Sequence, residues 1–128
     1  MQTLRWERMD AVDGATAEWD VLASQLTREA LEDAQWAEAN SVPTLCTATG
    51  DFSPHHTRAS AACAATHRKA WERLAKSTYD VALILEDDAR VVPQLADKVR
   101  IVINVLQRTR PFWTMCYLGT HDAGRRAN

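Results

Sequence analysis

The sequence predicts an α/β fold in which helices cover a parallel sheet, and two patterns support this prediction. Val81–Leu85 is an unbroken apolar run, which is typical of a strand buried on both faces. Segments with helical periodicity precede and follow this run. Glu86, Asp87 and Asp88 come directly after it, at the carboxyl end of the predicted strand, where open α/β sheets bind their ligands.

The first part of the chain predicts a short strand, a turn and two helices. Leu4–Met9 is the candidate strand, and the Asp-Gly pair at Asp13 is a turn signal. Thr16–Leu26 has the apolar stripe of a helix. Thr27 is a typical N-cap for a second helix, which should end near Ala39.

The longest predicted helix is Thr57–Lys76, whose apolar stripe includes Trp71. Its alanines would allow close approach to a sheet or to another helix. A further helix should follow Pro93 and end before Pro111, and Phe112–Leu118 is the last predicted strand. The apolar face of that further helix consists of Leu95, Val99, Val102, Ile103 and Leu106.

Composition restricts the class of protein. The chain has 128 residues, enough for one domain with a core, and its net charge of −2 excludes a broad basic surface for nucleic acid. No apolar run is long enough to span a bilayer, and the first residues contain no apolar signal segment. The three separated cysteines indicate buried thiols in a reducing compartment. We therefore expect a cytoplasmic protein, free or peripheral to a membrane.

The polar candidates each have a structural and a functional interpretation. Glu86, Asp87 and Asp88 form either an acidic turn that caps the next helix or a cluster that binds a cation. Asp13 is a turn former or a ligand-binding carboxylate. His67 lies beside an apolar stripe and is either a structural contact or a site residue. The adjacent histidines at 55 and 56 would point to opposite faces of an extended segment, so they make a poor chelating pair.

An ordered set of motifs resembles glycosyltransferase family 25, which includes bacterial lipooligosaccharide galactosyltransferases and collagen galactosyltransferases. The motifs are Ala11-Val12-Asp13-Gly14, Cys63-x-x-Thr66-His67-x-x-x-Trp71, Leu85-Glu86-Asp87-Asp88 and Tyr117-Leu118-Gly119. Together they span about Trp6 to Gly119. The resemblance implies a GT-A-like, Rossmann-like sheet that binds a nucleotide sugar.

The resemblance also implies a reaction and a site. The implied reaction transfers a hexose, galactose by analogy, from a UDP-sugar to a glycan, lipooligosaccharide or glycoprotein acceptor, in lipopolysaccharide (LPS) biosynthesis or a related pathway. A divalent metal, Mn²⁺ by analogy, would bind the acidic motif. The implied donor-binding residues are Asp13, His67, Glu86 and Asp87, and the implied metal ligands are Glu86, Asp88 and His121.

The family pattern also contains segments that this sequence does not match. Its usual first strand and its segments after the Leu-Gly strand have no counterpart here, so we expect residues 1–128 to form a single partial domain, incomplete at both ends. A catalytically inactive remnant that acts as an interaction or assembly module is the alternative. A different metal-dependent phosphoryl-transfer enzyme is disfavoured because the four glycines do not cluster into a phosphate loop.

Overall fold

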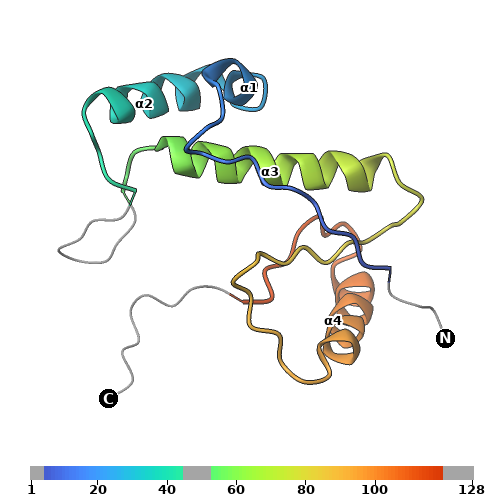
Figure 1. The fold of residues 1–128 in the computed structure, drawn as a ribbon. Coiled ribbons are helices and arrows are strands. Elements are labelled where there is room, and N and C mark those ends of the chain that lie inside the picture. The colour runs from blue at the N-terminus through green and yellow to red at the C-terminus, as the bar shows by residue number, and fades with distance from the viewer. Residues whose placement is uncertain (1–4, 45–52, 120–128) are drawn as a thin grey trace. The chain divides into compact units, whose positions relative to one another are not determined.

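The structure is a computed structural model that describes residues 5–44 and 53–119. The chain divides into two compact units, Met1–Ile84 and Leu85–Asn128. Among the described residues, no helix is long and apolar enough to cross a membrane. The helices are α1 (Trp19–Ala23), α2 (Arg28–Ala39) and α3 (Arg58–Ala75) in the first unit and α4 (Leu95–Thr109) in the second (Figure 1).

Side-chain caps determine where α2 and α3 begin. The Thr27 hydroxyl accepts a hydrogen bond from the Ala30 amide at 3.3 Å, which confirms the predicted N-cap of α2. At the start of α3, the Thr57 hydroxyl accepts from the Ser60 amide, and the Ser60 hydroxyl accepts from the Thr57 amide. Each cap satisfies amides that have no partner inside the helix. The expected limits of both helices are confirmed.

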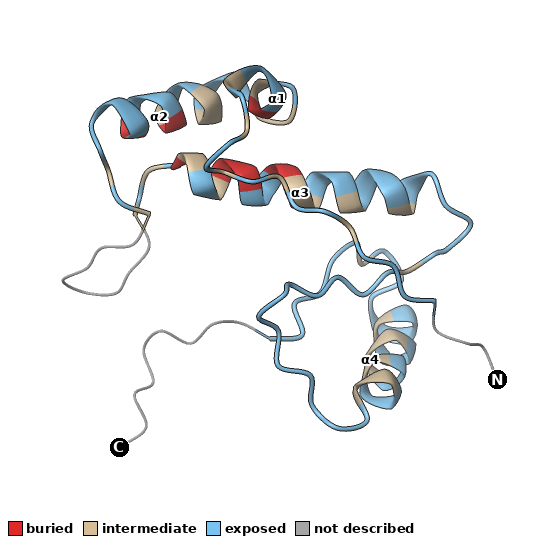
Figure 2. Cartoon of the chain, viewed as in Figure 1, coloured by how far each residue is buried: buried red, intermediate tan, exposed pale blue. Residues whose placement is uncertain are grey.

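The core of the first unit is small and lies where α1 and α2 pack against α3 (Figure 2). Alanines on α2 and α3 let the helix backbones approach closely, so the alanine-rich face of α3 contacts helices rather than a sheet. Trp71, which the stripe predicted as buried, is 46% exposed. The buried cluster consists of Leu22, Ala34, Ala61, Ala62 and Ala65.

Residues 5–13 run along α3 in the opposite direction to the helix (Figure 1). Glu7 forms an ion pair with Arg73 near the end of α3. Further along the segment, the Val12 amide donates to the Thr66 hydroxyl at 2.9 Å. The described part of the predicted strand Leu4–Met9 therefore has no neighbouring strand, and Glu7 links it to a side chain of α3 instead.

The predicted α/β, Rossmann-like, GT-A-like fold is wrong, because the described residues contain helices and no strand or sheet. Val81–Leu85 pairs with no strand among the described residues. The side chains of Leu83, Ile84 and Leu85 are 38–39% exposed. An apolar run indicates a preference for burial, but a strand also needs a partner for its backbone groups. The sequence pattern could not predict that partner, because the pairing of strands depends on segments that are far apart in the sequence.

In the second unit, α4 begins after Gln94, which has a left-handed backbone with φ 58°. Its C-cap is Arg110, directly before Pro111, as predicted. The predicted apolar face of α4 is half-buried along its whole length, whereas the other faces of the helix are exposed.

Candidate functional site

The Asp13 carboxylate holds its own turn together. One oxygen accepts a hydrogen bond from the Ala15 amide and the other from the Thr16 hydroxyl, each at 2.9 Å. The Ala15 amide lowers the pKa of Asp13 most, the Thr16 hydroxyl lowers it further, and partial desolvation opposes both. The residue is exposed, so an ionised carboxylate at this turn faces solvent at neutral pH.

Gly14 allows this turn to pack directly on α3. A Cβ at this position would lie 3.0 Å from the Ala59 Cα and 3.3 Å from the Ala62 Cβ. Both distances are tighter than nine in ten Cβ contacts in proteins, so a larger residue would require the turn or α3 to shift by a few tenths of an ångström. The Ala-Val-Asp-Gly motif therefore has a packing function in addition to its turn chemistry.

Thr66 connects this turn to His67. The Thr66 hydroxyl accepts from the Val12 amide and donates to the Ala62 carbonyl, both at 2.9 Å. Asp13 directly follows Val12 in the sequence, and His67 directly follows Thr66. His67 is half-buried, and its ring centroid lies 6.3 Å from that of Trp71. The structure thus brings the backbones of two predicted donor-binding residues into one part of the first unit.

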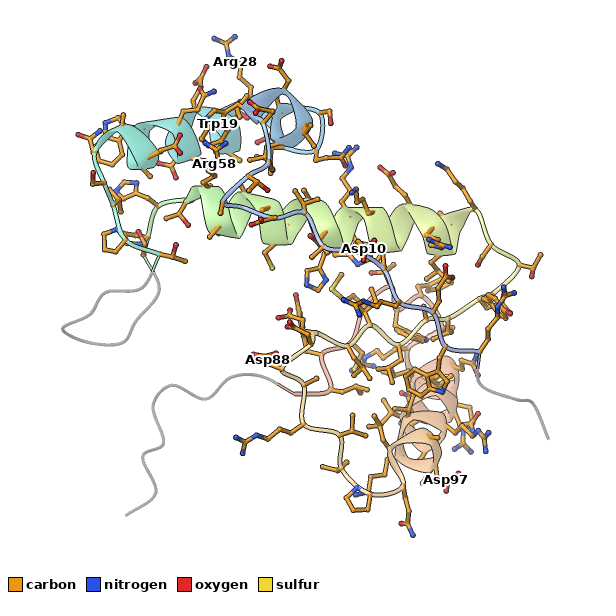
Figure 3. The ribbon with its side chains drawn as sticks, viewed as in Figure 1. Asp10, Trp19, Arg28, Arg58, Asp88 and Asp97 are labelled. Atoms are coloured by element: carbon orange, nitrogen blue, oxygen red, sulfur yellow. The ribbon has the colours of Figure 1, made fainter. Side chains whose placement is uncertain are left out.

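A cleft of about 440 Å³ lies beside the same turn. At its edge the Arg58 guanidinium donates to Glu38 at 2.7 Å and lies over the Trp19 ring, 4.8 Å from the centroid (Figure 3). The Trp19 indole also donates to Glu38, at 2.9 Å, and Arg58 also donates to the Ala17 carbonyl. The hydrogen bond from Arg58 is the main cause that lowers the pKa of Glu38. The lining residues are Gly14, Ala15, Glu38, Ser41, Val42, Thr44, Thr57, Arg58 and Ala59.

The lining of this cleft carries little net charge. Arg58 and Glu38 are each other's counter-ions. The remaining polar side chains of the lining are hydroxyls, and those of Thr44 and Thr57 lie 2.9 Å apart and bond each other. The sequence does not predict this cleft, because Arg58 and Glu38 lie on different helices and form no local motif.

The adjacent histidines are held by Asp33 of α2. One Asp33 oxygen lies 2.9 Å from the His55 Nδ1, and the other accepts from the His56 amide at 2.7 Å. The hydrogen bond to His55 lowers the pKa of Asp33 most, and the His56 amide contributes next. The His55 ring also contacts Trp36, with centroids 4.8 Å apart. These contacts give the two histidines a structural role that their neighbours in sequence do not reveal.

The acidic motif lies in an exposed turn of the second unit, where Figure 3 labels Asp88. The Ala89 amide donates to the Glu86 carbonyl at 3.1 Å, with Asp87 and Asp88 between them. The motif does form an acidic turn, but it does not cap the next helix, because α4 begins only at Leu95. The predicted ligand His121 lies outside the described residues.

The described cysteines differ from the expectation of buried thiols. Cys63 and Cys116 are both exposed and are not part of a disulfide, and Cys46 lies outside the described residues. Cys63 follows the helical periodicity of the α3 stripe, but the helices approach α3 on its alanine-rich face instead. The prediction of burial is therefore wrong for these two thiols.

Comparison with known proteins identifies the family. The family model described as glycosyltransferase family 25 (LPS biosynthesis protein) matches residues 1–121. The chain belongs to glycosyltransferase family 25. The family 25 match includes the Asp13 turn, the Thr66–His67 pair and the acidic motif, so it confirms the resemblance seen in the sequence. Membership places the chain among the glycosyltransferases of LPS biosynthesis. No curated protein and no solved structure matches the chain.

Proposed function

We propose that this family 25 chain takes part in transferring a hexose from a UDP-sugar to a glycan, lipooligosaccharide or glycoprotein acceptor. The proposed hexose is galactose. The observation that carries the proposal is an exposed turn of three consecutive carboxylates in a chain of this family. Neighbouring carboxylates repel one another, and a bound cation removes that repulsion. The proposed cofactor is a divalent metal ion, and the proposed ion is Mn²⁺.

The donor atoms at the acidic turn fit such a metal. Carboxylate oxygens are the ligands that Mn²⁺ and similar hard cations prefer, and the side chains of this turn are exposed. Glu86 and Asp88 are the proposed ligands from this turn, with His121 as a further ligand. When bound, a divalent metal would neutralise the negative charge of the departing diphosphate.

Asp13, His67 and Asp87 are the proposed donor-binding residues besides Glu86. The lowered pKa of Asp13 keeps its carboxylate ionised, so it can accept hydrogen bonds from hydroxyl groups of the nucleotide sugar. His67 is half-buried on α3 and can donate or accept through its ring nitrogens. Asp87 is exposed in the acidic turn and can accept from ribose hydroxyls directly or through water.

Calorimetric titration of UDP into the full chain, with and without Mn²⁺, tests the proposal. We expect UDP to bind only when Mn²⁺ is present. Asp88→Asn should weaken that binding at least about tenfold, the loss typical of a disturbed metal coordination shell. Asp80→Asn is the matched control, because it removes a charge from another exposed aspartate and should leave binding unchanged.

Two outcomes would contradict the proposal in different ways. If UDP does not bind in the presence of Mn²⁺, the chain by itself is not a working transferase. If UDP binds equally well to Asp88→Asn, the assignment of the metal site is wrong. A chain that binds no UDP would fit the alternative function, a catalytically inactive interaction or assembly module. That alternative is favoured by the large apolar side chains exposed in the second unit.

We also propose a cytoplasmic location. Support comes from the exposed thiol of Cys116, because a reducing compartment protects an exposed cysteine from oxidation.

A further inference from the structure

Cys63 and His67 lie one turn apart on α3 and form a pair of side chains that can bind a metal. Residues four positions apart on a helix are neighbours on its surface, and two ligands at this spacing hold zinc on the helices of metalloproteases. The Cys63 Sγ and a His67 ring nitrogen lie within 4.8 Å of each other. Both residues belong to α3 of the first unit, so one helix determines their spacing.

The distance between these two atoms suits a shared zinc ion. Zinc binds thiolate sulfur at about 2.3 Å and imidazole nitrogen at about 2.0–2.1 Å, in tetrahedral sites. These bond lengths place the sulfur and the nitrogen about 3.6 Å apart across one ion. Bringing the two atoms from within 4.8 Å to about 3.6 Å requires only a small rotation of the side chains.

The pair lies outside the core of the first unit. Cys63 is exposed and His67 is half-buried, and neither belongs to the buried cluster where α1 and α2 pack against α3. The Trp71 ring lies one turn beyond His67, with the two ring centroids 6.3 Å apart. Because Trp71 restricts movement of the imidazole away from Cys63, the pair is partly preorganised for a ligand.

The two ligand atoms favour a particular kind of metal. Thiolate sulfur and imidazole nitrogen both suit Zn²⁺, which is a borderline-soft ion. Mn²⁺ prefers carboxylate oxygens, such as those proposed as its ligands in the acidic turn. The pair on α3 therefore favours a different ion from the one proposed for the transfer reaction.

We propose that Cys63 and His67 bind one Zn²⁺ ion on α3. The Cys63 thiol releases its proton to solvent when the sulfur bonds to the metal, and the neutral His67 ring donates a lone pair from one nitrogen. Water molecules complete the tetrahedral coordination. The second ring nitrogen of His67 stays available for the proposed contact with the sugar donor. The zinc site therefore does not rest on the nucleotide-sugar proposal.

Alkylation of the full chain with iodoacetamide, with and without Zn²⁺ and in the absence of UDP, tests the site. A thiolate bound to a metal reacts more slowly, and peptide mass spectrometry measures each cysteine separately. Zn²⁺ at about ten times its dissociation constant should slow alkylation of Cys63 about tenfold. Alkylation of the exposed Cys116 should stay unchanged. Mn²⁺ in place of Zn²⁺ should protect neither thiol.

Two variants test the two ligands separately. His67→Gln removes the nitrogen ligand, so the Zn²⁺ affinity measured by protection of Cys63 should fall at least about tenfold. His56→Gln is the matched control, because it removes an imidazole outside α3 and should leave the protection unchanged. Co²⁺ bound to a thiolate gives a charge-transfer absorption band, which Cys63→Ser should abolish and Cys116→Ser should retain. Circular dichroism of every variant checks that the helices remain, and if His67→Gln loses helix, the cobalt band of Cys63→Ser still decides the outcome.

Several results would overturn the proposal. Equal protection of Cys63 and Cys116 by Zn²⁺ would indicate non-selective binding to exposed thiols. Unchanged protection of Cys63 in a folded His67→Gln variant would remove His67 from the site, and a cobalt band that persists in Cys63→Ser would place the metal elsewhere. Failure of the UDP titration would leave these results unaffected, because Zn²⁺ is tested without UDP.

Discussion

Replacing Thr66 by valine should detach the Asp13 turn from α3. Valine has nearly the same shape as threonine but has no hydroxyl, so the variant removes the acceptor of the Val12 amide. It also removes the hydroxyl hydrogen bond to the Ala62 carbonyl. Thr66→Ser is the matched control, because serine retains the hydroxyl and both of its hydrogen bonds.

The expected loss follows from the environment of the Val12–Thr66 hydrogen bond. An amide left without a partner in a buried site costs about 1–3 kcal/mol, and both residues here are half-buried. We therefore expect the free energy of unfolding to fall by about 1–2 kcal/mol in Thr66→Val. For a unit of this size, each kcal/mol lowers the melting temperature by about 4–8 °C. Thr66→Ser should remain close to the wild type.

Urea denaturation followed by circular dichroism measures the loss, and hydrogen exchange at the Val12 amide locates it. We expect faster exchange at Val12 in Thr66→Val than in Thr66→Ser, because the amide opens to water. If the two variants have equal stability and equal exchange at Val12, the hydrogen bond does not hold the turn on α3, and this part of the account is wrong.

Two further predictions concern packing and pH. Gly14→Ala should lower the free energy of unfolding by about 1–3 kcal/mol through overpacking against α3, whereas Gly119→Ala, where a Cβ meets nothing within 4 Å, should be neutral in urea denaturation. The pKa values of Asp13, Asp33 and Glu38 lie below their ordinary values of 3.8, 3.8 and 4.5. These carboxylates therefore stabilise the fold at pH values above the ordinary pKa. Their contribution is lost as the pH falls through each lowered pKa. Denaturation from about pH 5 downward should show falling stability, with a shallower fall in Asp33→Asn, and parallel curves would refute that role for Asp33.

The limits of α2 and α3 and the end of α4 were predictable because their signals are local, whereas α1 (Trp19–Ala23) is shorter than the predicted helix Thr16–Leu26. Thr27 and Thr57 cap α2 and α3 through residues three positions away, and proline follows the end of α4 directly. What periodicity misjudged was the orientation of α3. Its longest apolar side chains suggested burial of Trp71, but the helices pack where alanines allow the closest approach of backbones. Side-chain size, and not hydrophobicity alone, decided which face is buried.

The sheet and the cleft were not predictable from local patterns. Val81–Leu85 has the apolar composition of a strand, but composition does not supply a pairing partner. The contact between Arg58 and Glu38 and that between Asp33 and His55 join residues about 20 positions apart, which no short motif records. The family was recognisable because the resemblance depends on short ordered motifs, and the match of the family model confirmed the membership.

Binding of Mn²⁺ in the presence of UDP tests the central claim most directly. Electron paramagnetic resonance reports free Mn²⁺, whose signal decreases when the metal binds. We predict that wild-type chain with UDP strongly reduces this signal, and that Asp88→Asn with UDP leaves it close to that of a sample without protein. An equal decrease with Asp88→Asn would place the metal elsewhere, and no decrease with the wild type would contradict a metal-dependent nucleotide-sugar site in this chain.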